Sequence, residues 1–190
     1  MPILQTARLD LIPATAVHLR AELESPSTLA RALGIDVPAS WPPEFYDEDA
    51  IRFTLKAVVA NPAAADWGFY YLARRIPSDG RCLIGAGGFK GEPDADGMVE
   101  IGYSILPEHQ RQGYATEAVV EWVRFAFESP HVAMVIGQTL ASIVPSIRVL
   151  ERAGFRPAGT GHDPGAPEGE QVLRYELSRT AFDANSSVRL

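Results

Sequence analysis

Cysteine is almost absent from the 190-residue sequence, in which Cys82 is the single example. One cysteine excludes an internal disulfide framework and a cysteine-rich metal cluster, and it is typical of a reducing, cytoplasmic setting. The four histidines are scattered without the spacing of metal ligands, at His18, His109, His131 and His162. We therefore expect a cytoplasmic protein that binds no metal.

Long apolar runs and positive charge are also scarce. No run approaches the ~18 apolar residues of a membrane helix, and the first residues show no basic region followed by an apolar stretch. The 24 Asp and Glu residues outnumber the 17 Lys and Arg residues, for a net charge of −7. We therefore expect neither a membrane nor a nucleic acid as partner, since the latter requires a basic surface. A cationic substrate such as an amine suits this charge better.

The composition itself is that of a globular protein, with 46% hydrophobic and 22% charged residues. A length of 190 residues is most simply explained by a single domain over 1–190. Its last stretch, about 180–190, is polar and is expected to form a frayed tail.

A strand, a short turn and a helix are predicted in succession between Met98 and Ala126. Apolar and polar residues alternate over 98–105 with the period of a strand, which Pro107 ends. After Gly113 the apolar residues recur at helical spacing. The first amides of a helix lack internal partners and suit a phosphate, and glycine lets a ligand approach the backbone closely. The plainer alternative is a tight turn that needs one glycine.

The remaining periodicities predict further strands and helices on both sides of this stretch. Strands are expected over 8–12, 67–74, 82–89, 132–138, from 155 and over 171–177, and helices over 15–24, 26–34, 43–60 and 142–153. This order predicts an α/β (α+β) fold, with a mixed, mostly antiparallel central sheet of about six or seven strands and helices on both faces.

Two motifs in this order resemble a known family. The segment Gln110-Arg-Gln-Gly-Tyr-Ala115 resembles the Q/R-x-x-G-x-G/A signature of the GNAT superfamily of acyl-CoA-dependent N-acyltransferases. Gly113-Tyr-Ala-Thr-Glu-Ala118 and the segment from Ser146 to Phe155 resemble its Rim-type subgroup, which includes the ribosomal-protein N-terminal acetyltransferases. The close resemblance covers about residues 82–159. It implies a GNAT-like fold and acetyl-CoA as the co-substrate.

The resemblance also implies a cofactor site. The pyrophosphate cradle would be formed by Arg111, Gln112, Gly113, Tyr114, Ala115 and Thr116. In the family the preceding strand splays from its neighbour and pairs its backbone with the pantetheine arm, which implies a role for Ile105 and Leu106. A packing role for Tyr114 remains an alternative. The subgroup usually has asparagine where this sequence has Ile143, and this departure leaves the exact cofactor contacts open.

Two side chains are candidates for catalysis. Glu100 lies on the opposite side of its strand from the apolar residues, so it is our candidate general base; the alternative is a solvated carboxylate. The resemblance implies that Ser146 is the acid for the departing thiolate, and the alternative is a local hydrogen bond at a helix terminus. The superfamily's tyrosine four residues later is replaced here by Leu150.

The acceptor and its pocket are less defined. Trp41, Phe45 and the loop 159–169 are candidates to line the pocket, with aromatic packing and a surface loop as the alternative. The predicted reaction is acetyl transfer from acetyl-CoA to a primary amine, either a protein N-terminal amine or a small-molecule amine. A non-catalytic acyl-CoA-binding or sensing domain is the alternative function, and a homodimer is possible.

Overall fold

One mixed sheet organises the chain. The computed structural model describes residues 3–77, 80–163 and 165–187. Within them the sheet has eight strands in the order β1-β2-β3-β4-β5-β6-β8-β7. These strands are β1 (Leu4–Gln5), β2 (Leu9–Pro13), β3 (Phe69–Ile76), β4 (Gly80–Phe89), β5 (Met98–Ile105), β6 (Met134–Leu140), β7 (Arg156–Thr160) and β8 (Val172–Ser178).

The predicted mixed, mostly antiparallel sheet is confirmed, because every neighbouring pair of strands is antiparallel except β5 and β6. The predicted number of strands was slightly low. The additional strand, β1, has two residues, and two residues are too short to show an alternation in the sequence.

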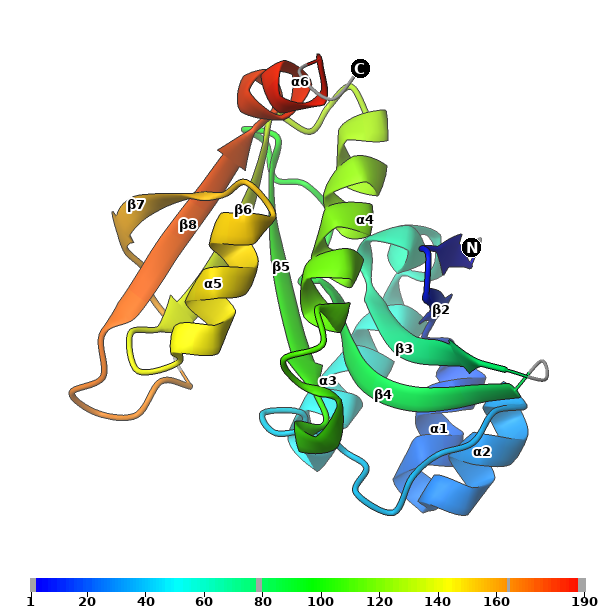
Figure 1. The fold of residues 1–190 in the computed structure, drawn as a ribbon. Helices are drawn as coiled ribbons and strands as arrows, with labels where there is room; N and C mark the ends of the chain where they lie inside the picture. Colours follow the sequence, from blue (N-terminus) through cyan, green and yellow to red (C-terminus); the bar gives the residue numbers. More distant parts are fainter. Residues whose placement is uncertain (1–2, 78–79, 164, 188–190) are drawn as a thin grey trace.

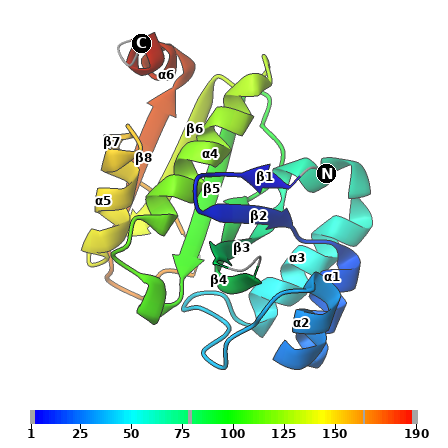
Figure 2. The same cartoon turned by 45° about the vertical axis from the view of Figure 1, so that its right-hand side comes forward.

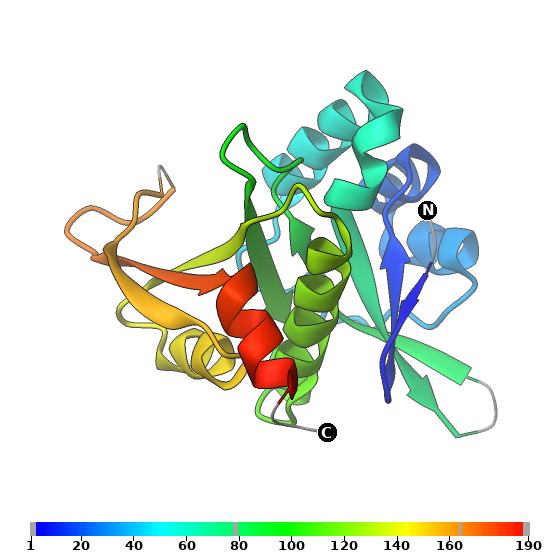
Figure 3. The same ribbon diagram turned by 90° about the horizontal axis from the view of Figure 1, so that it is seen from above.

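Helices cover both faces of the sheet, as predicted. In Figure 3, which looks from above, α1 (Ala16–Glu24) and α3 (Glu48–Ala60) lie on one side, and α4 (Tyr114–Glu128) and α5 (Val144–Arg152) lie on the other. Figure 1 labels the remaining helices, α2 (Pro26–Leu33) and α6 (Arg179–Ser187). No helix within the described part of the chain combines the length and the apolar character needed to cross a membrane.

Two boundaries differ from the sequence predictions. The helix expected from residue 43 begins at Glu48, because the Asp47 side chain accepts a hydrogen bond from the Ala50 amide and caps it there. The expected frayed tail is wrong over its first part, since α6 is helical and Phe182 packs against Phe127, with ring centroids 5.0 Å apart and ring planes tilted by 36°. Residues 188–190 lie outside the described chain.

The side chains of β5 divide between two environments. Val99, Ile101 and Ile105 are buried in the core that also contains the inner face of α4 and Leu150 of α5. A second core lies under α1 and α3 and includes Leu106. Glu100, between Val99 and Ile101, is half-buried on the opposite face. The predicted alternation along this strand is therefore correct.

The pairing of β5 with β6 is confined to the first half of β5. Residues 98–101 pair in parallel with residues 134–137, and beyond Ile101 the two strands diverge (Figure 1). At the point of divergence, Leu150 packs against Gly137 so closely that a Cβ there would lie 2.7 Å from a Leu150 methyl group. The second half of β5 therefore keeps a partner only in β4.

Candidate active site

The turn that enters α4 is built for backbone contacts. Gly113 adopts φ 85° and ψ 1°, a left-handed conformation that residues with a Cβ rarely adopt. It is the N-cap of α4 and has no side chain with which to cap the first amides of the helix. Those amides and the positive end of the helix are therefore available to an anion.

The β1–β2 hairpin fastens this turn from the side, where Figure 2 shows it next to α4. The Arg8 guanidinium donates to the Gln112 carbonyl oxygen over 3.0 Å and to the Glu117 carboxylate over 2.7 Å. It also lies 4.4 Å from the centre of the Tyr114 ring. Partial burial raises the pKa of Glu117, but hydrogen bonds from Thr6 and Arg8 outweigh it, so the pKa is lowered overall. Glu117 therefore remains a charged anchor for Arg8.

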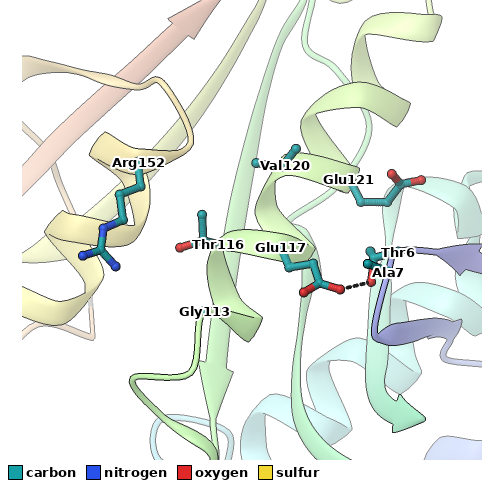
Figure 4. Close-up of a pocket in the computed structure, with 8 residues that line it drawn as sticks. All are labelled: Thr6, Ala7, Gly113, Thr116, Glu117, Val120, Glu121 and Arg152. Atoms are coloured by element: carbon teal, nitrogen blue, oxygen red, sulfur yellow. Dashed lines mark hydrogen bonds between the residues drawn. The ribbon is translucent and has the colours of Figure 1, made fainter. Parts of the chain in front are cut away.

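A cavity of about 490 Å³ opens beside this turn. Thr116 from α4 and Arg152 from α5 lie on its lining, and Figure 4 shows Arg152 across the opening from Thr116. On the α4 side the lining also includes Gly113, Glu117, Val120 and Glu121, and the β1–β2 hairpin contributes Thr6 and Ala7. The cavity thus joins the amino-terminal end of α4 to a cation on the neighbouring helix.

The predicted cradle residues occupy this region in different ways. Thr116 lines the cavity, and Ala115 is half-buried next to it. Arg111 is exposed with a left-handed φ of 58°, and the exposed Gln112 donates to the Glu108 carbonyl oxygen. Tyr114 is a buried packing residue beneath Arg8, which was the alternative for this residue, so it offers the site only its backbone.

The backbone of β5 differs between the two predicted positions. The Leu106 amide donates to Ile84 and its carbonyl oxygen accepts from the His109 amide, so both groups already have partners. Neighbouring residues of an antiparallel strand point their backbone N–H and C=O groups toward opposite edges of the strand. Because Leu106 bonds to β4, the backbone groups of Ile105 point toward the edge of β5 from which β6 has diverged. Its carbonyl oxygen accepts from the Gln110 side chain over 2.9 Å. Ile105 thus fits the expected role better than Leu106.

Glu100 is held by neighbours from two other strands or their ends. The Lys90 ammonium, just after β4, lies 2.5 Å from one carboxylate oxygen, and the Gln138 side-chain amide of β6 donates to the other over 3.1 Å. The side chain of Glu100 is 20% exposed and that of Lys90 is 52% exposed. Glu100 is therefore an oriented carboxylate that pairs with a half-exposed lysine.

Ser146 lies across β5 from Glu100, at the start of α5. Its hydroxyl is 3.1 Å from the phenol oxygen of Tyr103, which also donates to the Ser146 carbonyl oxygen over 3.2 Å. Burial raises the pKa of Tyr103 to about 12, although the hydrogen bond with Ser146 lowers it slightly. The superfamily's tyrosine is replaced by the buried Leu150, but Tyr103 brings a phenol to the same serine from the strand.

The two predicted pocket residues between α2 and α3, Trp41 and Phe45, lie in different environments. Trp41 is buried, and its indole donates to the Glu22 carboxylate over 2.7 Å, so it anchors the segment and the alternative of aromatic packing is correct for it. Phe45 is 70% exposed and has a left-handed φ of 63°. A bulky residue held exposed in such a conformation is a candidate for ligand contact.

Sequence reasoning missed the polar residues that support these groups. Arg8, Lys90, Tyr103 and Gln138 belong to four different segments of the chain. For Tyr103 a signal existed, because it follows Glu100 by three residues and so must point to the opposite face. The other three depend on strand order, which no local pattern gives. Within the described residues, no group of three or more His, Cys, Asp or Glu side chains is arranged to hold a metal ion.

Known proteins with similar sequences are acetyltransferases. YjdG of Bacillus subtilis strain 168, called an uncharacterized N-acetyltransferase, is 27% identical over 155 residues, which are 82% of this chain and 90% of YjdG. The FsC-acetyl coenzyme A-N(2)-transacetylase of Aspergillus fumigatus is 26% identical over 197 residues, which cover 94% of this chain and 77% of that protein.

A solved structure shows the same fold. RimL, a ribosomal L7/L12 alpha-N-protein acetyltransferase in complex with coenzyme A, superposes with a TM-score of 0.67 at 15% identity, over 95% of this chain and 99% of RimL. The sequence model for the acetyltransferase (GNAT) domain matches residues 8–156. These findings confirm the predicted superfamily and the acyltransferase class. The chain belongs to the GNAT acetyltransferase family.

Proposed function

We propose that the protein transfers an acetyl group from acetyl-CoA to a primary amine by direct attack of the amine on the thioester. The observation that carries the proposal is the position of β5. Its unpaired half leads into the Gly113 turn, one of its faces carries Glu100, and the other carries Tyr103 against Ser146. A thioester lying along this half-strand is exposed to a carboxylate on one side and to hydroxyl groups on the other.

Glu100 is the proposed general base. N-acylation requires a neutral amine, and the ordinary pKa is ~7.7–8.0 for an α-amino group and ~10.4 for lysine. Removing the proton at neutral pH therefore costs about 1 kcal/mol for the first and roughly 4–5 kcal/mol for the second. One positioned carboxylate is sufficient for the easier case, which favours an α-amine or another amine of modest basicity as the acceptor.

Ser146 and Tyr103 are proposed to stabilise the departing thiolate. The high pKa of Tyr103 keeps its phenol protonated at neutral pH, so it can hydrogen-bond to Ser146 or to the sulfur. A CoA thiol with an ordinary pKa near ~8.5 needs only modest assistance to leave. Hydrogen bonding is therefore enough at this position, and a strong acid is not required.

The proposed cofactor contacts follow from the same geometry. The amides at the start of α4 receive the pyrophosphate, with Arg111 and Gln112 beside them, and the backbone of Ile105 pairs with the pantetheine arm. Arg152 across the cavity is placed to meet a further phosphate. A backbone N–H of the unpaired half of β5 polarises the thioester carbonyl.

The acceptor is proposed to be a protein N-terminal amine or a small-molecule amine; RimL is named for an alpha-N-protein acceptor, and the transacetylase for transfer to an N(2) position. Release of free CoA thiol from acetyl-CoA should be measured with a panel of α-amino peptides, amino acids and polyamines. Amine-dependent release identifies the acceptor class. Tight acetyl-CoA binding with no release for any amine would contradict the proposal and leave an acyl-CoA-binding domain. A cytoplasmic location and a homodimer remain predictions.

A further inference from the structure

Gln138 joins Glu100 to the β7–β8 loop, within the stretch 159–169 that the sequence suggested as a lining of the acceptor pocket. Its side-chain nitrogen donates to Glu100 Oε2 over 3.1 Å, and its side-chain oxygen accepts from the His162 amide over 2.8 Å. Because the nitrogen can only donate and the oxygen can only accept, a single orientation of the amide satisfies both contacts. The carboxylate and the loop are thus fixed by the same group.

The loop approaches Gln138 through its backbone. A Cβ added to Gly161 would lie 2.0 Å from the Gln138 oxygen, so only a residue without a side chain allows this contact. The Gly161 amide donates to the Val172 carbonyl oxygen over 2.8 Å, which closes the base of the loop between β7 and β8. The chain therefore passes directly over the amide of Gln138 before it continues as the β7–β8 loop.

Charged groups surround the contact between Gln138 and Glu100, and the neutral side chain of Gln138 suits this environment. Glu100 already has the Lys90 ammonium on its other oxygen. On β8, Arg174 is paired in register with Gln138 and forms an ion pair with Glu176, which lies on the same sheet face as Glu100. The loop contributes His162 through its backbone. A neutral amide orients Glu100 without adding a charge to this set.

We infer that Gln138 is a positioning residue that fixes the Glu100 carboxylate and couples it to the β7–β8 loop, part of the stretch predicted to line the acceptor pocket. This inference rests on the proposed function, in which Glu100 accepts a proton from the amine. A substrate that contacts the loop near His162 moves the same amide that aims the carboxylate. Acceptor binding and base orientation are therefore linked through one side chain.

Three variants separate the two halves of the contact. Gln138→Glu keeps an oxygen for the His162 amide but replaces the donor to Glu100 with a second carboxylate. The interaction between like charges raises the pKa of the pair, so the acid limb of kcat/KM should move to higher pH by roughly one unit. Gln138→Asn shortens the arm without adding charge, and should lower kcat/KM about three- to tenfold with no such movement.

Gly161→Ala places a methyl group against the Gln138 oxygen, so it disrupts the contact from the loop side without adding a charge. It should raise the KM for the acceptor about three- to tenfold, leave the KM for acetyl-CoA unchanged and leave the pH profile in place. All variants are compared with one amine, so that the titration of the amine itself cancels. Thermal melting and acetyl-CoA titration establish that each variant is folded.

The results distinguish this inference from the proposed function. A wild-type protein that acetylates no amine would overturn the proposed function. A wild-type enzyme that is active, together with a Gln138→Glu acid limb at the wild-type pH or a Gln138→Asn kcat/KM at the wild-type value, would overturn the role of Gln138 alone. The expected split between the Gln138→Glu pH shift and the Gly161→Ala effect on acceptor KM would support it.

Discussion

The proposed cofactor turn and the proposed acceptor face of β5 differ in the groups from which they are built. The proposed cofactor turn, residues 110–116, is one continuous segment, and its proposed binding groups are the backbone amides at the start of α4. The proposed acceptor face joins Lys90, Glu100 and Gln138, which come from three separate segments, and there the Glu100 carboxylate is held by side chains. Binding by backbone amides depends on the conformation of the chain, whereas binding by side chains depends on the identity of each contributing residue.

This difference implies different sensitivities to substitution. The side chains of Arg111 and Gln112 are exposed beside the cofactor turn, so changing them removes donors without altering the helix terminus. On the acceptor face, removing one partner leaves Glu100 with an unmatched oxygen or an unmatched orientation. We therefore expect large catalytic effects from single changes there, with little effect on cofactor affinity.

The largest effect is expected from Glu100→Gln, which keeps the size of the side chain but removes its ability to accept a proton. At neutral pH it should lower kcat/KM by roughly 10²–10⁴, with part of the loss recovered as pH rises toward the pKa of the amine. Steady-state kinetics with a working acceptor measures this. Wild-type rates from pH 6 to 9 would show that Glu100 is only a surface carboxylate.

The same variant tests whether the two regions are independent. Acetyl-CoA affinity should be unchanged in Glu100→Gln, because the cofactor is held from the Gly113 turn. Calorimetric titration provides the comparison. A parallel loss of affinity would mean that Glu100 acts through cofactor binding.

A second, smaller effect is expected at Glu22, the buried carboxylate that accepts a hydrogen bond from Trp41. Glu22→Leu leaves the indole of Trp41 and the hydroxyls of Tyr46 and Tyr71 without their buried acceptor, and should reduce the free energy of unfolding by about 1–3 kcal/mol. Chemical denaturation measures it, and Val17→Ala, at an exposed position on the same helix, is the control. An unchanged free energy of unfolding would remove Glu22 as the anchor.

The pH dependence of this anchor has a defined sign. Burial raises the pKa of Glu22, against the opposing hydrogen bonds from Tyr71, Trp41 and Tyr46. A carboxyl whose folded pKa is raised stabilises the fold fully below its unfolded pKa, and this contribution is lost as pH rises through the folded pKa. The wild-type advantage over Glu22→Leu should therefore shrink as pH rises. An advantage that grows with pH would contradict this assignment.

The smallest effect is expected at the contact between Tyr103 and Ser146. Tyr103→Phe removes the contacts of the phenol with the hydroxyl and the carbonyl oxygen of Ser146 and should lower kcat about two- to tenfold, the range of a neutral hydrogen bond of about 0.5–1.5 kcal/mol. Because the pKa of Tyr103 is about 12, ionisation of this phenol should cause no loss of wild-type activity between pH 7 and 10. If Ser146→Ala and the double variant lose the same factor as Tyr103→Phe, the two hydroxyls act together; additive losses would make them independent.

The contrast between the two regions also explains what the sequence could reveal. The cofactor turn was predictable because strand, glycine and helix follow one another and carry their own signals, and β5 was predictable from its alternation. Gln138 and Lys90 were not, because their proximity to Glu100 depends on β6 and β4 flanking β5 in the sheet. Trp41 was assigned to the pocket because burial against Glu22 leaves no trace in a local aromatic pattern. The helix α6 was missed because its polar segment has few apolar residues to mark a period.

The central claim is that the Gly113 turn receives acetyl-CoA through its backbone, and calorimetric titration of acetyl-CoA into wild type and Gly113→Val tests it most directly. A β-branched residue at φ 85° is strained by about 1–3 kcal/mol and brings side-chain atoms to the amides of α4. We predict saturable binding by the wild type and loss of binding by the variant, with melting of the apo proteins confirming that both fold. Equal affinity for acetyl-CoA in the two proteins would contradict the account.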